Sequence, residues 1–280
     1  MSNSDLTIII NTFKSEEQIH TCLDSIGHEF KILIVENSNN NEFKTTIEKK
    51  YPNVTCKLTG ENLGYAKGNN FGLSKVDSRF ALILNPDTLL HKDTLKNFLS
   101  TASKLNDFAI IAPAIQEKKD LISSNKIEKV VEVNTVKGFA MFLNLKEFKD
   151  IGYFDENFFI YFEEIDLCRR LKNNNKKIYL DPKIKISHVG GSSHNQSINF
   201  EMELSRNWHW MWSTFYFHKK YNGFMIGLLK VSKKLISSVF KVAIYSILLN
   251  NKKRKIYFQR FSGLYNSILG RKSWYRPRLF

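Results

Sequence analysis

Continuous apolar runs, without polar alternation, open the chain. Leu6 to Thr12 and Lys31 to Val35 are rich in β-branched residues, which predicts parallel strands that are covered on both faces. Between them Ile19, Leu23 and Ile26 recur at helical spacing. A strand, a helix and a second strand in this order predict a right-handed crossover and therefore an α/β fold with a mostly parallel central sheet flanked by helices.

The same kind of pattern continues to about residue 190. We expect further strands over residues 54–58, 81–84, 108–112, 136–143, 177–180 and 184–187, and helices over residues 92–105 and 163–171. The polar and irregular segment 116–132 is predicted to be a surface excursion. With 280 residues, the chain is long enough for one large domain or for a domain with an appendage.

A stretch rich in glycine and asparagine follows the third predicted strand. Residues 60–70 are predicted to form a loop that leads into a helix through Phe71 and Leu73. The glycine spacing matches neither a Walker A motif nor a dinucleotide fingerprint. Lys67 within it could meet a phosphate, although an ordinary loop has a similar composition.

An acidic turn ends the predicted strand at residues 81–84. Pro86 removes a backbone donor and stops the strand, so Asp87 stands just past its carboxyl end, where open α/β sheets bind their ligands. A carboxylate in that place can hold a divalent cation against a phosphate. Asn, Pro and Asp are also common in simple turns, so this segment alone leaves both interpretations open.

Three carboxylates and a histidine are further candidates. Glu163, Glu164 and Asp166 open a predicted helix after the aromatic segment 152–162. They could cap that helix, or a crowded carboxylate among aromatic rings could acquire raised basicity; the rings could stack on a sugar or pack in a core. His188 follows a predicted strand and precedes two glycines, which fits a structural, a metal-binding or a phosphate-binding histidine.

Charge separates the end of the chain from the rest. Of a net charge of +15, residues 201–280 carry 16 basic and 2 acidic side chains, and no acid follows Glu203. Cys22, Cys56 and Cys168 lack zinc-ligand or redox spacing, and the N-terminal residues do not resemble a signal peptide. We therefore expect a reduced, cytoplasmic setting.

The basic region is also aromatic and apolar. Aromatic residues fill 205–223, and the apolar segment 224–249 carries Lys230, Lys233, Lys234 and Lys241. Four lysines argue against a membrane-spanning helix. An amphipathic helix at the membrane surface fits better, with residues 252–255 as a patch for anionic lipid. A helical pair that packs on the domain and exposes a basic face has the same pattern.

Seven motifs in order carry a resemblance to a known family. The chain resembles the inverting family-2 glycosyltransferases over roughly residues 5–220, and most closely their rhamnosyltransferase-like branch. The motifs are Ile9-Ile10-Asn11-Thr12-Phe13, Val35-Glu36-Asn37-Ser38, residues 62–70, Leu84-Asn85-Pro86-Asp87-Thr88, Gly152-Tyr153-Phe154-Asp155-Glu156, residues 161–167 and His188-Val189-Gly190-Gly191-Ser192.

The resemblance implies a GT-A fold and a reaction. We expect a glycosyltransferase domain over residues 1–205, with a nucleotide-binding half at about 1–115 and an acceptor half at about 116–205. A basic helical tail over 206–280 would follow. The implied reaction is metal-assisted single displacement, which moves rhamnose or a similar sugar from a dTDP- or UDP-sugar to a glycan or a lipid-linked acceptor. It would serve cell-surface polysaccharide synthesis at the inner face of the cell membrane.

The resemblance also implies a role for each matching residue. Thr12, Glu36 and Asn62 would line the nucleoside site, Lys67 and Asn70 would flank the sugar diphosphate, and Asn85 occupies the first acidic position of the family's Asp-x-Asp motif. Asp87 and His188 would bind Mg²⁺ or Mn²⁺. Glu164 occupies the place of the family's general base, with Glu163 and Asp166 as alternatives.

Two other functions remain as alternatives. A sugar-nucleotide nucleotidyltransferase would share a similar sheet, but residues 11–14 are not its glycine-rich, basic signature. A non-enzymatic module could bind nucleic acid or membrane through residues 201–280, but the ordered motifs of the first part would then have no purpose. We expect no nucleic-acid partner.

Overall fold

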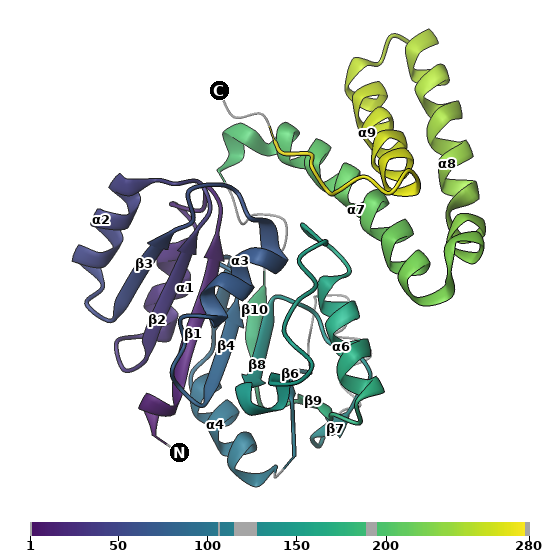
Figure 1. Ribbon diagram of the computed structural model, residues 1–280. Coiled ribbons are helices and arrows are strands. Elements are labelled where there is room, and N and C mark those ends of the chain that lie inside the picture. Colours follow the sequence, from purple (N-terminus) through teal and green to yellow (C-terminus); the bar gives the residue numbers. More distant parts are fainter. Residues whose placement is uncertain (1, 106, 115–127, 189–194, 278–280) are drawn as a thin grey trace. The chain divides into compact units, whose positions relative to one another are not determined.

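Two compact units make up the protein (Figure 1). The computed structural model describes residues 2–105, 107–114, 128–188 and 195–277. The sheet unit comprises Met1–Phe154 and Glu164–Asn195, and the helical unit comprises Asp155–Glu163 and Gln196–Phe280. Each unit has hydrophobic clusters of its own.

An eight-stranded sheet forms the centre of the sheet unit, with the order β3-β2-β1-β4-β8-β6-β9-β7. Strands β1 to β4 lie side by side and parallel, β8 runs antiparallel to β4 and β6, and β6 and β9 are parallel. The strands are β1 (Leu6–Thr12), β2 (Lys31–Glu36), β3 (Val54–Leu58), β4 (Phe80–Leu84), β6 (Ile110–Pro113), β7 (Val131–Glu132), β8 (Ala140–Asn144) and β9 (Ile178–Asp181). The α/β prediction is confirmed.

Helices cover both faces of this sheet, which explains the continuous apolar strands. The helices are α1 (Ile19–Ile26), α2 (Asn41–Lys50), α3 (Gly64–Leu73), α4 (Thr94–Lys104) and α6 (Glu163–Asn173), with short 3₁₀ turns at Asn3–Asp5 and Leu145–Phe148. Residues of α1, α2 and α4 share one core cluster with Ile8 and Ile10. Helix α3 lies on the opposite face, where a Cβ on Gly72 would approach Ile9 and Val35 to 2.7 and 3.0 Å.

A second, two-stranded sheet joins distant parts of the sheet unit. Strand β5 (Thr88–Leu90) pairs antiparallel with β10 (Ile186–His188), and Thr88 lies opposite His188. The sequence analysis predicted β10 but not β5, because three residues are too few to show a period. This pairing brings His188, at the end of β10, next to Asp87, which directly precedes β5.

Two local predictions need correction, and one helix was not predicted. The Gly/Asn-rich segment is helical from Gly64, because packing on β1 and β2 outweighs the poor helix propensity of its residues. Strand β8 begins at Ala140 and not at residue 136, since Phe139 instead gives its carbonyl to the amide of Asn85 at 2.9 Å. Helix α2 was not predicted, although Asn40 caps it by accepting the amide of Phe43. Most of the predicted surface excursion 116–132 lies outside the described residues, and its end forms strand β7.

The helical unit consists of three long helices, α7 (Asn199–Asn222), α8 (Phe224–Ile247) and α9 (Asn251–Ile268), with a short 3₁₀ turn at Gln196–Ile198. Helix α9 packs closely on α7, since a Cβ on Gly263 would lie 2.2 Å from the carbonyl oxygen of Trp208. The indole of Trp208 donates to Ser262 Oγ at 3.1 Å, so the ring is anchored as well as buried. Among the described residues, no helix combines the length and the hydropathy needed to cross a membrane.

Candidate active site

Thr12 and Glu36 end the two neighbouring strands β1 and β2, and both side chains are buried. Thr12 Oγ1 donates to the carbonyl of Val35 at 3.3 Å. The Glu36 carboxylate accepts the amides of Ser38 and Asn40 at 2.8 and 2.7 Å. These two predicted nucleoside-site residues therefore shape the chain at the carboxyl edge of the sheet, where the side chains of a ligand site would gather.

Two asparagines that were not among the predicted site residues fix the start of α3 at this edge. Asn37 Oδ1 accepts the amide of Leu63 at 3.1 Å, and Asn11 Nδ2 donates to the carbonyl of Gly64 at 3.0 Å. Asn37 also donates to the side chain of Asn11. The signal that could have indicated them is their position at the ends of two buried strands.

The predicted diphosphate-site residues on α3 have different surroundings. Asn70 forms two hydrogen bonds with the backbone of Phe154, donating to its carbonyl at 2.9 Å and accepting its amide at 3.0 Å. Asn70 therefore positions the chain before the aromatic segment. Lys67 is half exposed, with Nζ 3.8 Å from Glu61 Oε1, and its ammonium group is accessible to an anion. Asn62 Oδ1 accepts the amide of Gly64.

Asp87 and His188, which the family resemblance implies as metal ligands, lie close together. His188 Nε2 is 3.3 Å from Asp87 Oδ1. The imidazole stacks on Phe139, with ring centroids 4.5 Å apart and planes 5° from parallel, so its orientation is fixed. Phe139, which the sequence analysis did not single out, is thus part of this cluster together with the backbone of Asn85.

The surroundings of Asp87 fit a bound cation. Its side chain is 3% exposed, and neither carboxylate oxygen has a hydrogen-bond partner in the described part of the chain. A buried carboxylate without donors is costly, and a divalent cation is a natural counter-charge for it. Within the described ranges no three His, Cys, Asp or Glu side chains cluster as a metal site. Asp87 and His188 would therefore leave coordination positions for phosphate oxygens or water.

The three candidate bases on α6 differ in what they bind. Asp166 is buried and accepts Arg170 Nε at 2.8 Å, and that guanidinium also binds backbone carbonyls of residues 151–153. Asp166 is thereby engaged in a structural ion pair. Glu163 is buried at the first position of the helix.

Glu164 differs from Asp166 in the surroundings of its carboxylate. Its Oε2 is buried and has no hydrogen-bond partner among the described residues. Burial raises the pKa of this carboxyl above its ordinary value, against backbone hydrogen bonds and the charge of Lys137, which act the other way. A carboxylate of raised basicity is suited to general-base catalysis.

The segment Gly138–Phe139 links this carboxyl to the Asp87 cluster. A Cβ on Gly138 would lie 3.7 Å from Cβ of Glu164 and 3.1 Å from Tyr65 Oη, and Tyr65 donates to the Gly138 carbonyl. The next residue, Phe139, supports the His188 ring. Glu164, Asp87 and His188 therefore surround one short backbone segment, whereas Thr12 and Glu36 lie at the ends of β1 and β2.

Comparison with known proteins gives one family. Residues 7–170 match the family model described as Glycosyl transferase family 2. The chain is 28% identical over 198 residues to the low-salt glycan biosynthesis hexosyltransferase Agl10 of Haloferax volcanii, covering 62% of this chain and 64% of Agl10. It is 24% identical over 239 residues to the rhamnosyltransferase WbbL of Escherichia coli, covering 72% and 88% of the two chains. The chain thus spans slightly less than two thirds of Agl10.

Solved structures share the fold. The mannosyltransferase PcManGT of Pyrobaculum calidifontis, in complex with GDP-Man and Mn²⁺, has a TM-score of 0.61 at 11% identity, over 96% of this chain and 88% of its own. Residues 1–349 of TarS from S. aureus have a TM-score of 0.54 at 15% identity, over 97% and 92% of the two chains. At these identities the similarity shows the GT-A fold alone.

Proposed function

Because this chain belongs to glycosyl transferase family 2, whose members act on nucleotide sugars, we propose that it moves a hexosyl group to a hydroxyl of a glycan or a lipid-linked glycan. A rhamnosyl group carried by dTDP or UDP is the donor that we favour. The names of the two relatives, a glycan-biosynthesis hexosyltransferase and a rhamnosyltransferase, support this choice. We propose further that the reaction takes place at the inner face of the cell membrane, where a lipid-linked acceptor would be held.

The observation that carries the proposal is the pair of buried, unsatisfied oxygens on Asp87 beside His188. These two residues would hold Mg²⁺ or Mn²⁺, which when bound would stabilise the negative charge that develops on a leaving nucleoside diphosphate. Asp87 supplies the anionic ligand, and Phe139 keeps the imidazole of His188 in place. Mn²⁺ in the GDP-Man complex of PcManGT is consistent with this assignment.

Glu164 supplies the second half of the chemistry in this proposal. It would take the proton from the acceptor hydroxyl as that oxygen attacks the anomeric carbon and the nucleoside diphosphate departs. One displacement inverts the anomeric centre, so a single carboxylate base suffices and no nucleophilic carboxylate is needed. Asp166 is held by Arg170, which favours Glu164 for this role, and Lys67 is available to bind a donor phosphate.

Asp87→Asn tests the proposal through both binding and activity. We expect Mn²⁺ to raise the melting temperature of the wild-type protein and not that of the variant. Without metal, the variant should melt close to the wild type, because the amide oxygen of Asn can still lie against His188 Nε2 while a buried charge is removed. Turnover of dTDP- or UDP-sugar, followed as release of the nucleoside diphosphate, should fall about 100-fold or more.

Asp150→Asn is the matched control, since Asp150 is exposed. It should keep both the melting response to Mn²⁺ and the turnover. Undiminished turnover by Asp87→Asn, or an equal Mn²⁺ response in both variants, would contradict the assignment of Asp87.

A further inference from the structure

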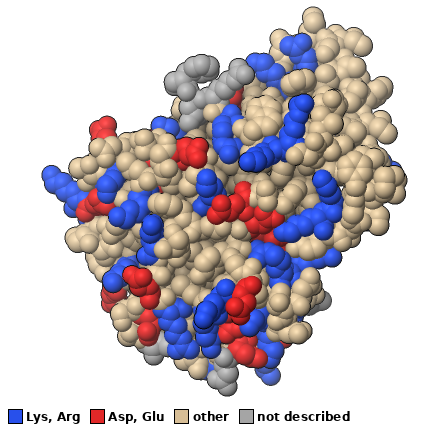
Figure 2. Space-filling view, viewed as in Figure 1, with Lys and Arg blue, Asp and Glu red and all other residues tan. Residues whose placement is uncertain are grey.

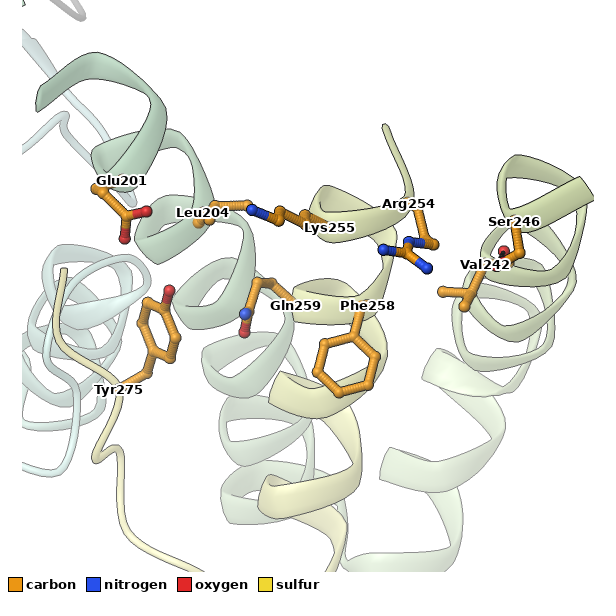
Figure 3. A pocket seen from close by; sticks show the side chains of 9 residues that line it. All are labelled: Glu201, Leu204, Val242, Ser246, Arg254, Lys255, Phe258, Gln259 and Tyr275. Carbon is orange, nitrogen blue, oxygen red and sulfur yellow. Dashed lines mark hydrogen bonds between the residues drawn. The ribbon is translucent and has the colours of Figure 1, made fainter. Parts of the chain in front are cut away.

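A cavity of about 410 Å³ lies within the helical unit, and none of its lining residues is among those discussed as the active site. Leu204 of α7, Val242 of α8 and Phe258 of α9 line it with apolar groups, and Tyr275 closes one end (Figure 3). Arg254 and Lys255 of α9 bring two cations to the same wall. In Figure 3 their side chains diverge, Lys255 toward α7 and Arg254 toward α8. The cavity is therefore both apolar and cationic.

The side chains of these two cations have no partner in the part of the chain that the structure describes. Among the described residues, no hydrogen bond or ion pair engages the side chain of Arg254 or Lys255. Glu201 also lines the cavity, so it holds two positive groups against one negative group. Both cations stand in the first turns of α9, where the helix dipole adds to the attraction for an anion. Arginine and lysine both bind phosphate oxygens well, and because these two side chains diverge in Figure 3, they must change rotamer to reach the same phosphate.

An exposed apolar row on α8 lies beside the cavity. Met225, Leu229, Ile236, Phe240 and Ile247 are spaced along one side of the helix and are 67, 71, 69, 66 and 81% exposed. Leu248 and Leu249 extend the row at 65 and 84%. Ser246, which lines the cavity, immediately precedes Ile247. Such a contiguous apolar surface indicates a contact with something apolar.

The charge around the apolar row indicates which kind of partner contacts it. In residues 204–280 every charged side chain is basic, and Figure 2 shows Lys and Arg on an otherwise uncharged surface over α8 and α9. If α8 packed on α8 of a second copy, Lys230 and Lys233 would face lysines with no carboxylate to offset them. An anionic bilayer satisfies both the row and the cations.

We propose that the cavity between α7, α8 and α9 binds the phosphate of an anionic membrane lipid, whose acyl chains lie along the apolar row of α8. Arg254 and Lys255 would bind the phosphate oxygens. Phe258, which is 52% exposed and lines the cavity, would lie against the first carbons of the lipid. This inference rests on the helical unit alone and does not depend on the sugar-transfer proposal.

Vesicle co-sedimentation of the full-length protein tests the site. The vesicles are phosphatidylcholine alone, or phosphatidylcholine with about 30 mol% phosphatidylglycerol as the anionic lipid. We expect binding to the anionic vesicles and little binding to the neutral ones. If the lipid were attracted only by a diffuse basic surface, each cation removed would weaken binding by about fivefold, wherever on that surface it lies.

The decisive comparison is between two pairs of substitutions with the same change in charge. Arg254→Gln/Lys255→Gln removes the cavity cations, and Lys230→Gln/Lys233→Gln removes two exposed cations of α8 outside the cavity. We expect the cavity pair to lose at least about tenfold more affinity than the control pair, because the phosphate loses direct hydrogen bonds as well as charge. Equal losses, or a larger loss for the control pair, would overturn the site.

Two further arms test the lipid and its chains. Leu229→Ser/Phe240→Ser should reduce sedimentation with anionic vesicles; unchanged sedimentation, or a dimer in solution that this variant dissociates, would overturn the contact with the acyl chains. Glycerol phosphate should protect the protein little against heating, and strong protection without vesicle binding would identify a soluble phosphate ester instead. Arg254→Gln/Lys255→Gln should retain release of nucleoside diphosphate from the sugar donor, so the two proposals can fail separately.

Discussion

At the scale of single residues, burial decides which carboxylates are available for chemistry. Asp166 and Glu164 are two residues apart on α6, yet Asp166 is engaged by Arg170 and Glu164 has a buried oxygen without a partner. Glu36 is buried as well but caps a turn. Whether a carboxylate is free to accept a proton therefore depends on the hydrogen-bond donors around it and not on whether it belongs to Asp or Glu.

The pH dependence of sugar transfer should report on Glu164. A base must be deprotonated, and burial raises the pKa of this carboxyl. We therefore expect kcat to fall on the acid side, through an apparent pKa above the ordinary value of a glutamate. Glu164→Gln should retain donor affinity and lose transfer by at least about 100-fold. Asp166→Asn should instead lower stability, by loss of the ion pair with Arg170.

A pH–rate profile of the wild type and thermal melting of the three proteins separate these outcomes. If Glu164→Gln kept its transfer rate while Glu163→Gln lost it, the base would be Glu163.

For single residues, the sequence and its family resemblance indicated which site residues lie close together, but not the hydrogen bonds that they form. Asp87 and His188 were paired in the prediction and lie 3.3 Å apart. The hydrogen bonds of Asn70 with Phe154 could not be foreseen, because the two residues are 84 positions apart and only the folded chain brings them together. Phe139 was not predicted as a site residue, because nothing in an apolar run of sequence indicates that one of its rings stacks on His188.

At the scale of elements, α3 shows how packing overrides composition. Its glycines and asparagines are poor helix formers, and a loop was predicted there. Gly68 is required because α3 lies so close to β1 that a Cβ would come within 2.6 Å of Asn11 Nδ2. Strand pairing is similarly hidden, since β5 and β10 are about a hundred residues apart and too short to predict from propensity.

Gly68→Ala should therefore destabilise the protein, by about 1–3 kcal/mol. Helix propensity alone predicts the opposite sign, a gain of about 0.5–1 kcal/mol, so the sign of the change is diagnostic. Urea unfolding measures it. Asn11→Ala/Gly68→Ala is the control, since truncation of Asn11 removes the clash and the double variant should lose less than the sum of the two single changes.

At the scale of the whole molecule, two units with separate cores and different charge make up one chain. The continuous apolar strands made the sheet unit predictable, and the charge count separated the basic region. The three-helix arrangement was not predictable, because its contacts depend on single close approaches such as that of Gly263 to Trp208.

Acid should unfold the helical unit through His209. This imidazole is fully buried, binds Tyr275 O at 2.9 Å and Ser273 Oγ at 3.1 Å, and burial lowers its pKa to about 3. The unfolded chain takes up the proton near pH 6.5 and the native unit does not. Stability is therefore lost as the pH falls below about 6.5, with a slope of about 1.4 kcal/mol per pH unit from this group.

Urea unfolding at several values between pH 7 and pH 4 measures this slope, and two transitions are expected for two units. In His209→Gln the free energy of unfolding of the helical unit should depend less steeply on pH, by about 1.4 kcal/mol per pH unit. An unchanged slope would show that another group carries the acid sensitivity.

The turn that precedes α6 has a consequence for how the protein is made. Tyr161 and Phe162 both have φ of +72°, a conformation that costs about 1–2 kcal/mol for each such residue. Their rings pack on Trp210 and Phe217 of α7, and this packing offsets the strain. During synthesis Trp210 and Phe217 leave the ribosome roughly fifty residues after Tyr161 and Phe162. The chain in front of Glu164 can therefore take its native form only late in translation, and a product terminated before α7 would fold its first strands but lack a formed turn.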